Sequence, residues 1–265
     1  MSLFTDGPAA SIDDLRRYDS SATDLSHEAG IDLDAKLSVA AEEVGQEIFS
    51  FLLLHSTPGY SDANLFLSGG TGESIRRRLG LSDVVVTPAV RRWTALKALA
   101  GLYRDAYASD VTDRFRLKWE EYDNLAQEAQ DYTFTTGIGL ARNPVPKAPV
   151  GVVTQTSQAT ERTDCSIRIT WISGESVEGA PSDLWHDSLG AGDLITVPGP
   201  APTGVAGWNV YVAQGDGTPL QQNGSLLAPN AAWTMIDGPL GQGKAVIEGQ
   251  TPDYLVIDRQ ILLRG

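Results

Sequence analysis

The chain has 265 residues, 42% of them apolar, so it is long enough for two modest domains with their own cores. Its formal net charge of −14 would repel nucleic-acid phosphates, which argues against a protein that grips or reads DNA. The single cysteine, Cys165, excludes an internal disulfide framework and a cysteine-based zinc site. The sequence shows neither a secretory signal nor an apolar run of the ~20 residues that a membrane helix needs. We therefore expect an aqueous, reducing compartment and no membrane association.

Four helices are predicted in the first half of the chain, where apolar residues recur at helical spacing. The second of these helices ends by His55, because a Pro-Gly pair follows. The expected N-terminal signals are the capping-box pair Ser11 and Asp14, then Asp32, then Thr87 with Pro88, and finally Asp110.

A long polar segment, roughly residues 56–86, separates the second and third of these helices. A connection of this length is usually functional or ordered by a partner. It ends near the basic triplet Arg76, Arg77 and Arg78, which is a candidate contact for the acidic face of a neighbouring copy. The alternative is that the triplet is simply a solvated helix face.

The periodicity changes at residues 143–149, where three prolines disfavour a helix and favour an extended linker. We therefore expect a helical assembly domain over residues 1–142, a linker over 143–149 and a β domain over 150–251. Residues 252–265 are expected to form a C-terminal strand or a docking arm.

Short alternating segments separated by turns follow the linker, and their length favours an antiparallel β-sandwich over a closed barrel. The predicted fold class is therefore multidomain, with a bundle of about four helices followed by an all-β domain. The predicted strands cover residues 149–155, 166–172, 194–197, 208–212, 221–227, 232–236 and 254–263.

No catalytic arrangement is recognisable in the sequence. The glycine run at residues 69–72 is followed by Glu73, near where a phosphate-binding loop requires lysine. None of the three histidines has a second ligand at metal-binding spacing, and His186, although next to Asp187, lacks a nucleophile motif. We therefore expect no enzyme activity, no cofactor and no metal.

Four of the six tryptophans fall on apolar stripes or inside predicted strands and are expected in the cores. Trp185 and Trp233 lie near predicted turns instead. These two residues are the candidate exposed aromatic contacts.

Two segments of the second half resemble fibronectin type III-like modules. Residues 204–213 resemble the third strand of such a module, with Trp208 in place of the usual tyrosine. Residues 167–171, together with Ala180-Pro181-Ser182-Asp183, resemble its closing strands. Because the closing pattern precedes the opening one, the resemblance implies a permuted or variant fibronectin- or immunoglobulin-like sandwich.

The first half resembles the head-to-tail adaptor (connector) proteins of tailed bacteriophages, through residues 11–15, 28–33 and 87–93. The resemblance implies a structural virion protein, made in the host cytoplasm and located in the neck of the virion. Such proteins form a closed ring of about twelve copies, with the portal protein above and stopper or tail proteins below. DNA passes through the lumen without sequence-specific binding, and a negative charge suits such a channel.

The adaptor resemblance also implies that the C-terminal segment reaches toward the portal or a neighbouring copy. The segment is apolar enough to add a strand to a sheet edge, although it is equally compatible with the last strand of its own sandwich. Its candidate contact residues are Tyr254, Leu255, Ile257, Ile261, Leu262 and Leu263.

Two other functions remain open from the sequence. One is another phage tail or baseplate component, with the sandwich as an outward decoration. The other is a carbohydrate-binding accessory module, in which Trp185 or Trp233 would stack on a sugar. Binding to a portal would distinguish the adaptor from the first, and sugar binding would identify the second.

Overall fold

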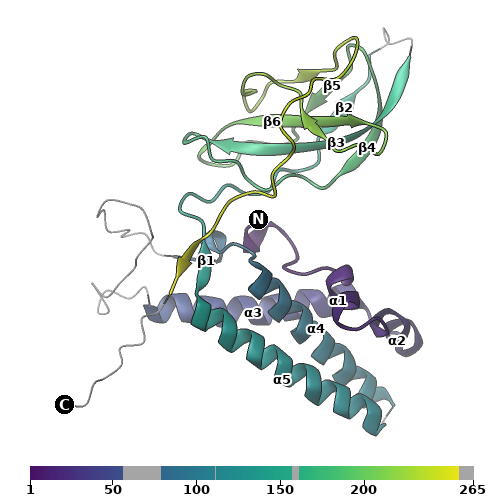
Figure 1. Cartoon of the computed structure of the whole chain (residues 1–265), viewed down its shortest axis with the longest axis vertical. Coiled ribbons are helices and arrows are strands. Elements are labelled where there is room, and N and C mark those ends of the chain that lie inside the picture. The colour runs from purple at the N-terminus through teal and green to yellow at the C-terminus, as the bar shows by residue number, and fades with distance from the viewer. Residues whose placement is uncertain (56–78, 111, 157–160, 257–265) are drawn as a thin grey trace, which may run out of the picture. The chain divides into compact units, whose positions relative to one another are not determined.

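A computed structural model describes residues 1–55, 79–110, 112–156 and 161–256, and the chain divides into two compact units (Figure 1). The helical unit contains residues 7–142 and the chain from Pro252 onward. The β unit contains residues 1–6 and 143–251. The chain therefore leaves the helical unit at Arg142, forms most of the β unit, and returns to the helical unit at Pro252.

The predicted combination of helices followed by antiparallel sheets is confirmed. The described residues contain five α-helices, one more than the sequence indicated; the additional helix has Leu25 as its only large apolar residue, so no repeat marks it. The helices are α1 (Ile12–Tyr18), α2 (Ala22–Ala29), α3 (Leu33–His55), α4 (Pro88–Ser109) and α5 (Asp113–Thr136), with short 3-10 turns at Phe4–Asp6 and Leu81–Asp83.

Side-chain caps set the starts of three helices. At α1, the Ser11 amide donates to the Asp14 carboxylate and the Asp14 amide donates to Ser11 Oγ, which completes the expected capping box. The carboxylate of Asp32 accepts two amide hydrogen bonds at the start of α3. Thr87 accepts the amide of Val90 at the start of α4.

Asp110 was predicted to cap the last helix, and this is wrong. Asp110 follows the last residue of α4, and its amide donates to the carbonyl of Ala106. Thr112 precedes α5. An aspartate between two closely spaced helices is compatible with either end, so the sequence pattern could not assign it.

The core of the helical unit is built around α4, which packs against α3 and α5 and also contacts α1 and α2. Trp93 of α4 is 1% exposed, as expected for a core tryptophan. Phe134 of α5 meets Trp93 edge-on with ring centroids 5.5 Å apart and stacks on Phe51 of α3 at 4.6 Å. These aromatic contacts join the three long helices at one end of the unit.

The β unit consists of two antiparallel sheets, ordered β2-β5-β8 and β4-β3-β6-β7. Strand β4 (Trp185–Gly190) and, in the helical unit, strand β1 (Ile138–Leu140) were not predicted, because β4 is mostly polar and β1 has only three residues. The strands of the β unit are β2 (Val152–Thr154), β3 (Arg162–Ser173), β4 (Trp185–Gly190), β5 (Leu194–Thr196), β6 (Val205–Gln214), β7 (Leu220–Gln221) and β8 (Trp233–Thr234).

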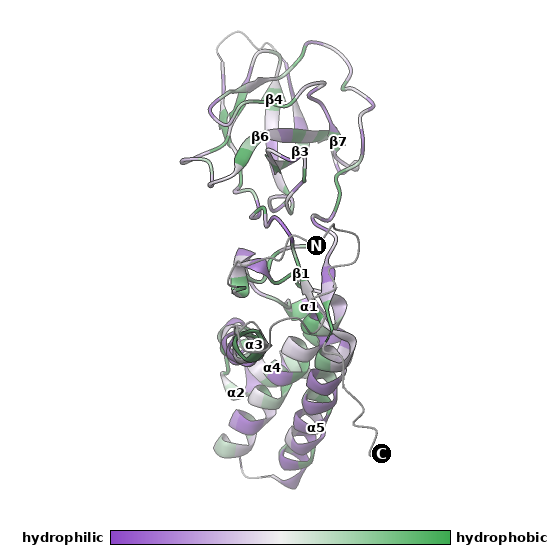
Figure 2. Cartoon of the chain, turned by 90° about the vertical axis from the view of Figure 1, so that its left-hand side faces the viewer, coloured by the Kyte–Doolittle hydropathy of each residue, from purple (hydrophilic) through white to green (hydrophobic). Residues whose placement is uncertain are grey.

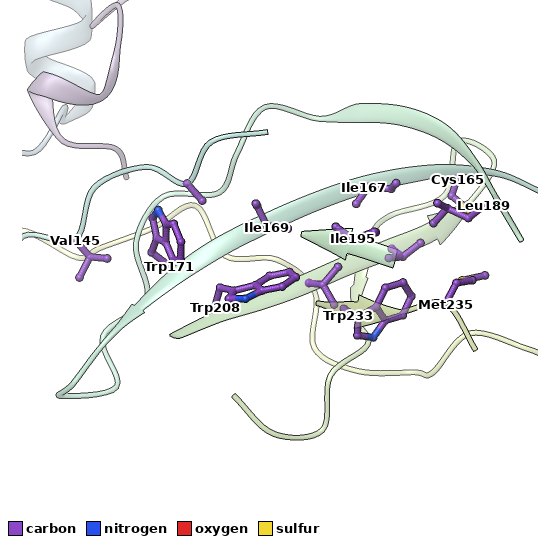
Figure 3. Packing of buried hydrophobic residues seen from close by; sticks show 13 residues of the cluster. Val145, Cys165, Ile167, Ile169, Trp171, Leu189, Ile195, Trp208, Trp233 and Met235 are labelled. Atoms are coloured by element: carbon purple, nitrogen blue, oxygen red, sulfur yellow. The ribbon is translucent and has the colours of Figure 1, made fainter. Parts of the chain in front are cut away.

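One hydrophobic cluster joins the two sheets of the β unit (Figure 3). Trp171 of β3 and Trp208 of β6 are 2% and 0% exposed, as expected, and Ile195 of β5 joins them from the other sheet. Cys165 is also buried in this cluster, where it acts as a small apolar residue.

Residues 143–149, expected to be an extended linker between the two domains, are part of the β unit. Val145 and Ala148 are each 3% exposed and belong to the core cluster. The Val145 amide donates to Gln250 Oε1 at 2.8 Å, and Gln250 Nε2 donates to the Asn143 carbonyl at 2.7 Å. The prolines of this stretch keep it extended, as predicted, but its alternating apolar residues pack inward.

Candidate assembly surface

A small sheet in the helical unit is centred on strand β1 (Ile138–Leu140). Helix α5 ends at Thr136, and the φ of +104° at the following Gly137 turns the chain away from the helix. On one side of β1, the Val85 amide donates to the Gly139 carbonyl at 2.9 Å. On its other side, β1 pairs with β9 (Asp253–Leu255).

Strand β9 brings the C-terminal segment back to the helical unit. It runs antiparallel to β1, with Ile138 opposite Leu255 and Leu140 opposite Asp253. Leu255 is 6% exposed, whereas Tyr254 is 45% exposed. The alternative expectation, that this segment completes its own β domain, is therefore wrong.

Two glycines that were not among the predicted site residues, Gly137 and Gly139, make this pairing possible. A Cβ atom at Gly139 would lie 2.7 Å from Thr87 Cγ2 and 2.9 Å from Pro252 Cβ. A Cβ atom at Gly137 would lie 2.8 Å from the Leu255 carbonyl oxygen. The Gly-Ile-Gly-Leu motif directly after α5 was the available signal, since glycines in a strand often mark a close backbone approach.

The outer edge of β9 has no further strand partner among the described residues. Tyr254 and, directly after the strand, Val256 are 45% and 47% exposed. Unpaired strand edges with apolar side chains are the usual sites of strand addition. We call Asp253 to Val256 the β9 edge. The other predicted contacts, Ile257, Ile261, Leu262, Leu263 and the triplet Arg76, Arg77 and Arg78, lie outside the described residues.

A hydrogen-bonded cluster connects the α1–α2 turn to α4 and α5. The Tyr103 and Tyr122 hydroxyls donate to Asp19 Oδ2 at 2.6 and 2.9 Å, and their rings stack with centroids 5.5 Å apart. Burial and the bond to Asp19 raise the pKa of Tyr103 to about 12 and raise the pKa of Tyr122 as well. Burial alone would raise the pKa of Asp19, but the Ser21 and tyrosine donors lower it.

Ion pairs and a hydrogen bond connect α3 to α4 and α5. Lys97 Nζ lies 2.8 Å from Glu47 Oε1 and 3.3 Å from Glu43 Oε2, and Gln130 donates to Glu47 from α5. Burial would lower the pKa of Lys97, but the two glutamates raise it. Because the tyrosine–Asp19 cluster and these pairs lie between helices of the same unit, their evident role is to hold the helices in place.

The most deeply buried charge lies in the β unit. The Asp193 side chain is fully buried and accepts the amides of Thr156 and Gly190 at 2.6 and 2.8 Å. Arg162 Nη1 lies 2.7 Å from its Oδ2. Burial would raise the pKa of Asp193, but these amides and the Arg162 charge lower it. The carboxylate is thus saturated by structural partners.

His186 lies on β4, not in a loop, and Ser166 of β3 is its partner across the strands. Ser166 Oγ is 3.2 Å from His186 Nδ1, but it donates to the Gly215 carbonyl at 2.5 Å. Because its proton is directed to a carbonyl, Ser166 is not arranged as a nucleophile activated by the histidine.

The exposed-aromatic prediction is wrong for Trp233. It is 6% exposed and lies in the core cluster, because β8 turns its side chain toward the other sheet. Trp185 is only partly buried, but it packs against the same cluster. Neither residue forms the flat exposed platform that sugar stacking requires.

Among the described residues, no group of three or more histidine, cysteine, aspartate or glutamate side chains could hold a metal ion. None of the described helices is long and apolar enough to cross a membrane. No family model, curated protein or solved structure matches the chain.

Proposed function

We propose that the chain is a structural virion protein, a head-to-tail adaptor of a tailed bacteriophage. In this role copies form a ring beneath the portal protein and leave a channel for DNA. The proposal rests on the resemblance of residues 11–15, 28–33 and 87–93, which lie around α1, at the end of α2 and at the start of α4. It assigns the chain no catalytic activity.

The observation that carries the proposal is the β9 edge. An adaptor needs a C-terminal segment that can reach another subunit, and here the described part of that segment forms β9, which pairs with β1 on one side and has no strand partner among the described residues on the other. Tyr254 and Val256 supply exposed apolar side chains beside a strand edge that no other described strand pairs with. A strand of the portal or of a neighbouring copy could therefore extend this sheet.

The β unit fits a permuted fibronectin-like sandwich within the same proposal. In immunoglobulin-like sandwiches, the third strand and the two closing strands share one sheet. Here β3 carries residues 167–171 of the closing pattern, residues 180–183 lead into β4, and β6 carries the third-strand pattern, with β3 between β4 and β6. The strand order therefore agrees with an interpretation in which the closing hairpin precedes the third strand in the chain.

The charge of the chain is compatible with this role. A net charge of −14 disfavours retention of DNA phosphates in a lumen. The charge supports the proposal without having generated it, since acidic proteins serve many functions.

Light scattering of the protein, alone and mixed with the portal protein of the same phage, tests the proposal. We expect a shift to a large complex of defined stoichiometry. If no complex with the portal protein forms under any condition tested, the adaptor assignment is wrong.

A matched pair of variants tests the β9 edge itself. Val256→Lys places a charge beside the open strand edge and is expected to weaken portal binding, since lysine at an edge discourages strand addition. Ile247→Lys in the β unit is the control, because Val256 and Ile247 are both 47% exposed. Equal loss of binding in both variants would count against the β9 edge as the contact.

A further inference from the structure

The chain beyond β7 leaves the edge of its sheet and then returns to it. Strand β7 pairs with β6 (Figure 2), and the following Gln222 amide still donates to the Val210 carbonyl at 2.9 Å. The next backbone pairing with β6 is at Leu227, which exchanges two hydrogen bonds with Trp208. Residues 223–226 therefore form a bulge beside β6, and the last three of these residues are exposed.

The side chain of Asn223 fills the gap that this bulge leaves in the sheet, and it is 8% exposed. Its Oδ1 accepts the Val210 amide at 2.9 Å, in the place of a strand carbonyl. Its Nδ2 donates to Asn209 Oδ1 at 2.8 Å and to the Ser225 carbonyl at 2.9 Å. Three hydrogen bonds therefore hold the carboxamide, and of the two that Nδ2 donates only the bond to Asn209 reaches a distant part of the chain.

Asn223 is also the only asparagine of the chain that a glycine follows. In such a pair the glycine nitrogen, once it has lost its proton to the solvent, can attack Cγ of the asparagine, because no side chain hinders the approach. The new N–C bond closes a succinimide ring and Nδ2 leaves as ammonia. Water then opens the ring to aspartate or isoaspartate. The Gly224 amide that would attack is exposed and makes no hydrogen bond among the described residues, so the nucleophile is accessible.

We propose that Asn223 is a site of spontaneous deamidation, and that local opening of the 223–226 bulge sets the rate of the reaction. Ring closure makes Cγ tetrahedral and expels Nδ2, so both hydrogen bonds that Nδ2 donates are lost as the reaction proceeds. The fold supplies the bond to Asn209 and thereby slows the reaction, whereas an unfolded chain lacks it. This site is independent of the proposed adaptor role, since neither portal binding nor ring formation enters the reaction.

Peptide mapping by mass spectrometry measures the reaction in the full chain, incubated in mildly alkaline buffer with and without urea. We expect deamidation of Asn223 in the folded chain to be at least about tenfold slower than in urea, because several hydrogen bonds hold the carboxamide only in the fold. Equal rates, or a faster reaction in the folded chain, would overturn the proposal. Absence of the reaction in urea would overturn it as well.

Variants of Asn209 test the protecting bond. Asn209→Ala removes the acceptor of Nδ2 and should accelerate deamidation of the folded chain about two- to tenfold, with no effect in urea. Asn209→Asp retains an acceptor oxygen and should keep the reaction slow. Asn124→Ala, at an exposed asparagine of α5, is the control. Thermal unfolding checks that each variant is folded at the incubation temperature. If Asn209→Ala does not accelerate the reaction, or Asn209→Asp accelerates it as much, this bond does not set the rate and the proposal is wrong.

Gly224→Ala tests the nucleophile. Nothing lies within 4 Å of an added Cβ atom, and the φ of Gly224 is outside the left-handed region, so the fold should tolerate the methyl group. The methyl group hinders the attack on Cγ, and deamidation should therefore be slower than in the unchanged protein, both in the folded chain and in urea. An unchanged rate would mean that the amide is lost by direct hydrolysis, and the proposed route through Gly224 would be wrong.

Discussion

The two units hold their buried polar groups in different ways. The β unit relies on one fully buried carboxylate, Asp193, which accepts the amide of Thr156 after β2 and of Gly190 at the end of β4 and pairs with Arg162. In the helical unit, Asp19 and Lys97 lie between helices and stay partly exposed, although the two tyrosines that donate to Asp19 are buried. Helices satisfy their backbone groups internally, whereas irregular corners between strands need side-chain acceptors. A single residue should therefore matter more in the β unit.

The largest effect is expected at Asp193. Asp193→Ala removes the carboxylate that pairs with Arg162 and leaves the amides of Thr156 and Gly190 without this acceptor, so it should destabilise the β unit by about 3–5 kcal/mol. Tryptophan fluorescence would follow this unit, which contains four of the six tryptophans. Helical circular dichroism should show the helical unit unfolding as in the unchanged protein. Asp216→Ala, in an exposed turn, is the control.

The next effect concerns the strand that returns to the helical unit. Gly139→Ala introduces a methyl group that would lie within 3 Å of Thr87 and Pro252, and overpacking of this kind costs about 1–3 kcal/mol. We expect β9 to separate from β1 first, so amide hydrogen exchange of residues 253–256 should rise. Gly174→Ala is a matched control, because nothing lies within 4 Å of its added Cβ atom. Unchanged exchange would show that the sheet absorbs the methyl group.

The two units also differ in how far the sequence predicts them. Local signals were sufficient for three helix starts, since the caps at Ser11, Asp32 and Thr87 depend on neighbours within a few residues, but they missed α2 and misassigned Asp110. Core tryptophans such as Trp171 were identified by strand alternation. The predictions that failed depend on contacts between distant segments. Trp233 was predicted to be exposed near a turn, because β8 has only two residues and no alternation marks it.

The candidate site shows the same limit. An apolar C-terminal segment indicated a strand with Tyr254 and Leu255, but no local pattern specifies which sheet it joins. That choice depends on Gly137 and Gly139, which lie far away in the sequence and leave room for the returning chain. Contacts between distant segments are decided by packing, which single-sequence periodicity does not contain.

The helical unit should respond to pH through the Asp19 cluster. Because the folded pKa of Asp19 lies below its ordinary value of 3.8, its contribution is present above about pH 4 and is lost as pH falls through the folded pKa. We expect Asp19→Asn to lower the free energy of unfolding by about 1 kcal/mol at neutral pH, since the site is partly exposed. The same change should weaken the dependence of stability on pH below about pH 4. Helical circular dichroism during urea unfolding at several pH values measures this.

Tyr103 makes the stability of the helical unit depend on pH at the alkaline end. Its pKa is raised from 10.0 to about 12, so its contribution is present below pH 10 and is lost as pH rises through about 12. Tyr103→Phe should therefore reduce stability at neutral pH and weaken the alkaline dependence. Tyr132→Phe, at an exposed position of α5, should change neither.

The smallest effect is expected at Lys97, and it gives the sharpest test of the comparison. Lys97 pairs with Glu47 and Glu43, but all three side chains keep 27–46% of their exposure, so solvent screens the attraction. Lys97→Met retains the apolar stem and should cost only about 0.5 kcal/mol, measured by urea unfolding at low salt and diminishing at high salt. Lys244→Met, in the β unit and without an ion pair among the described residues, is the control. If Lys97→Met instead lowers stability as much as Asp193→Ala, the partly exposed ion pairs of the helical unit contribute as much as the buried carboxylate of the β unit. Burial of the charged group would then not explain the difference between the two units.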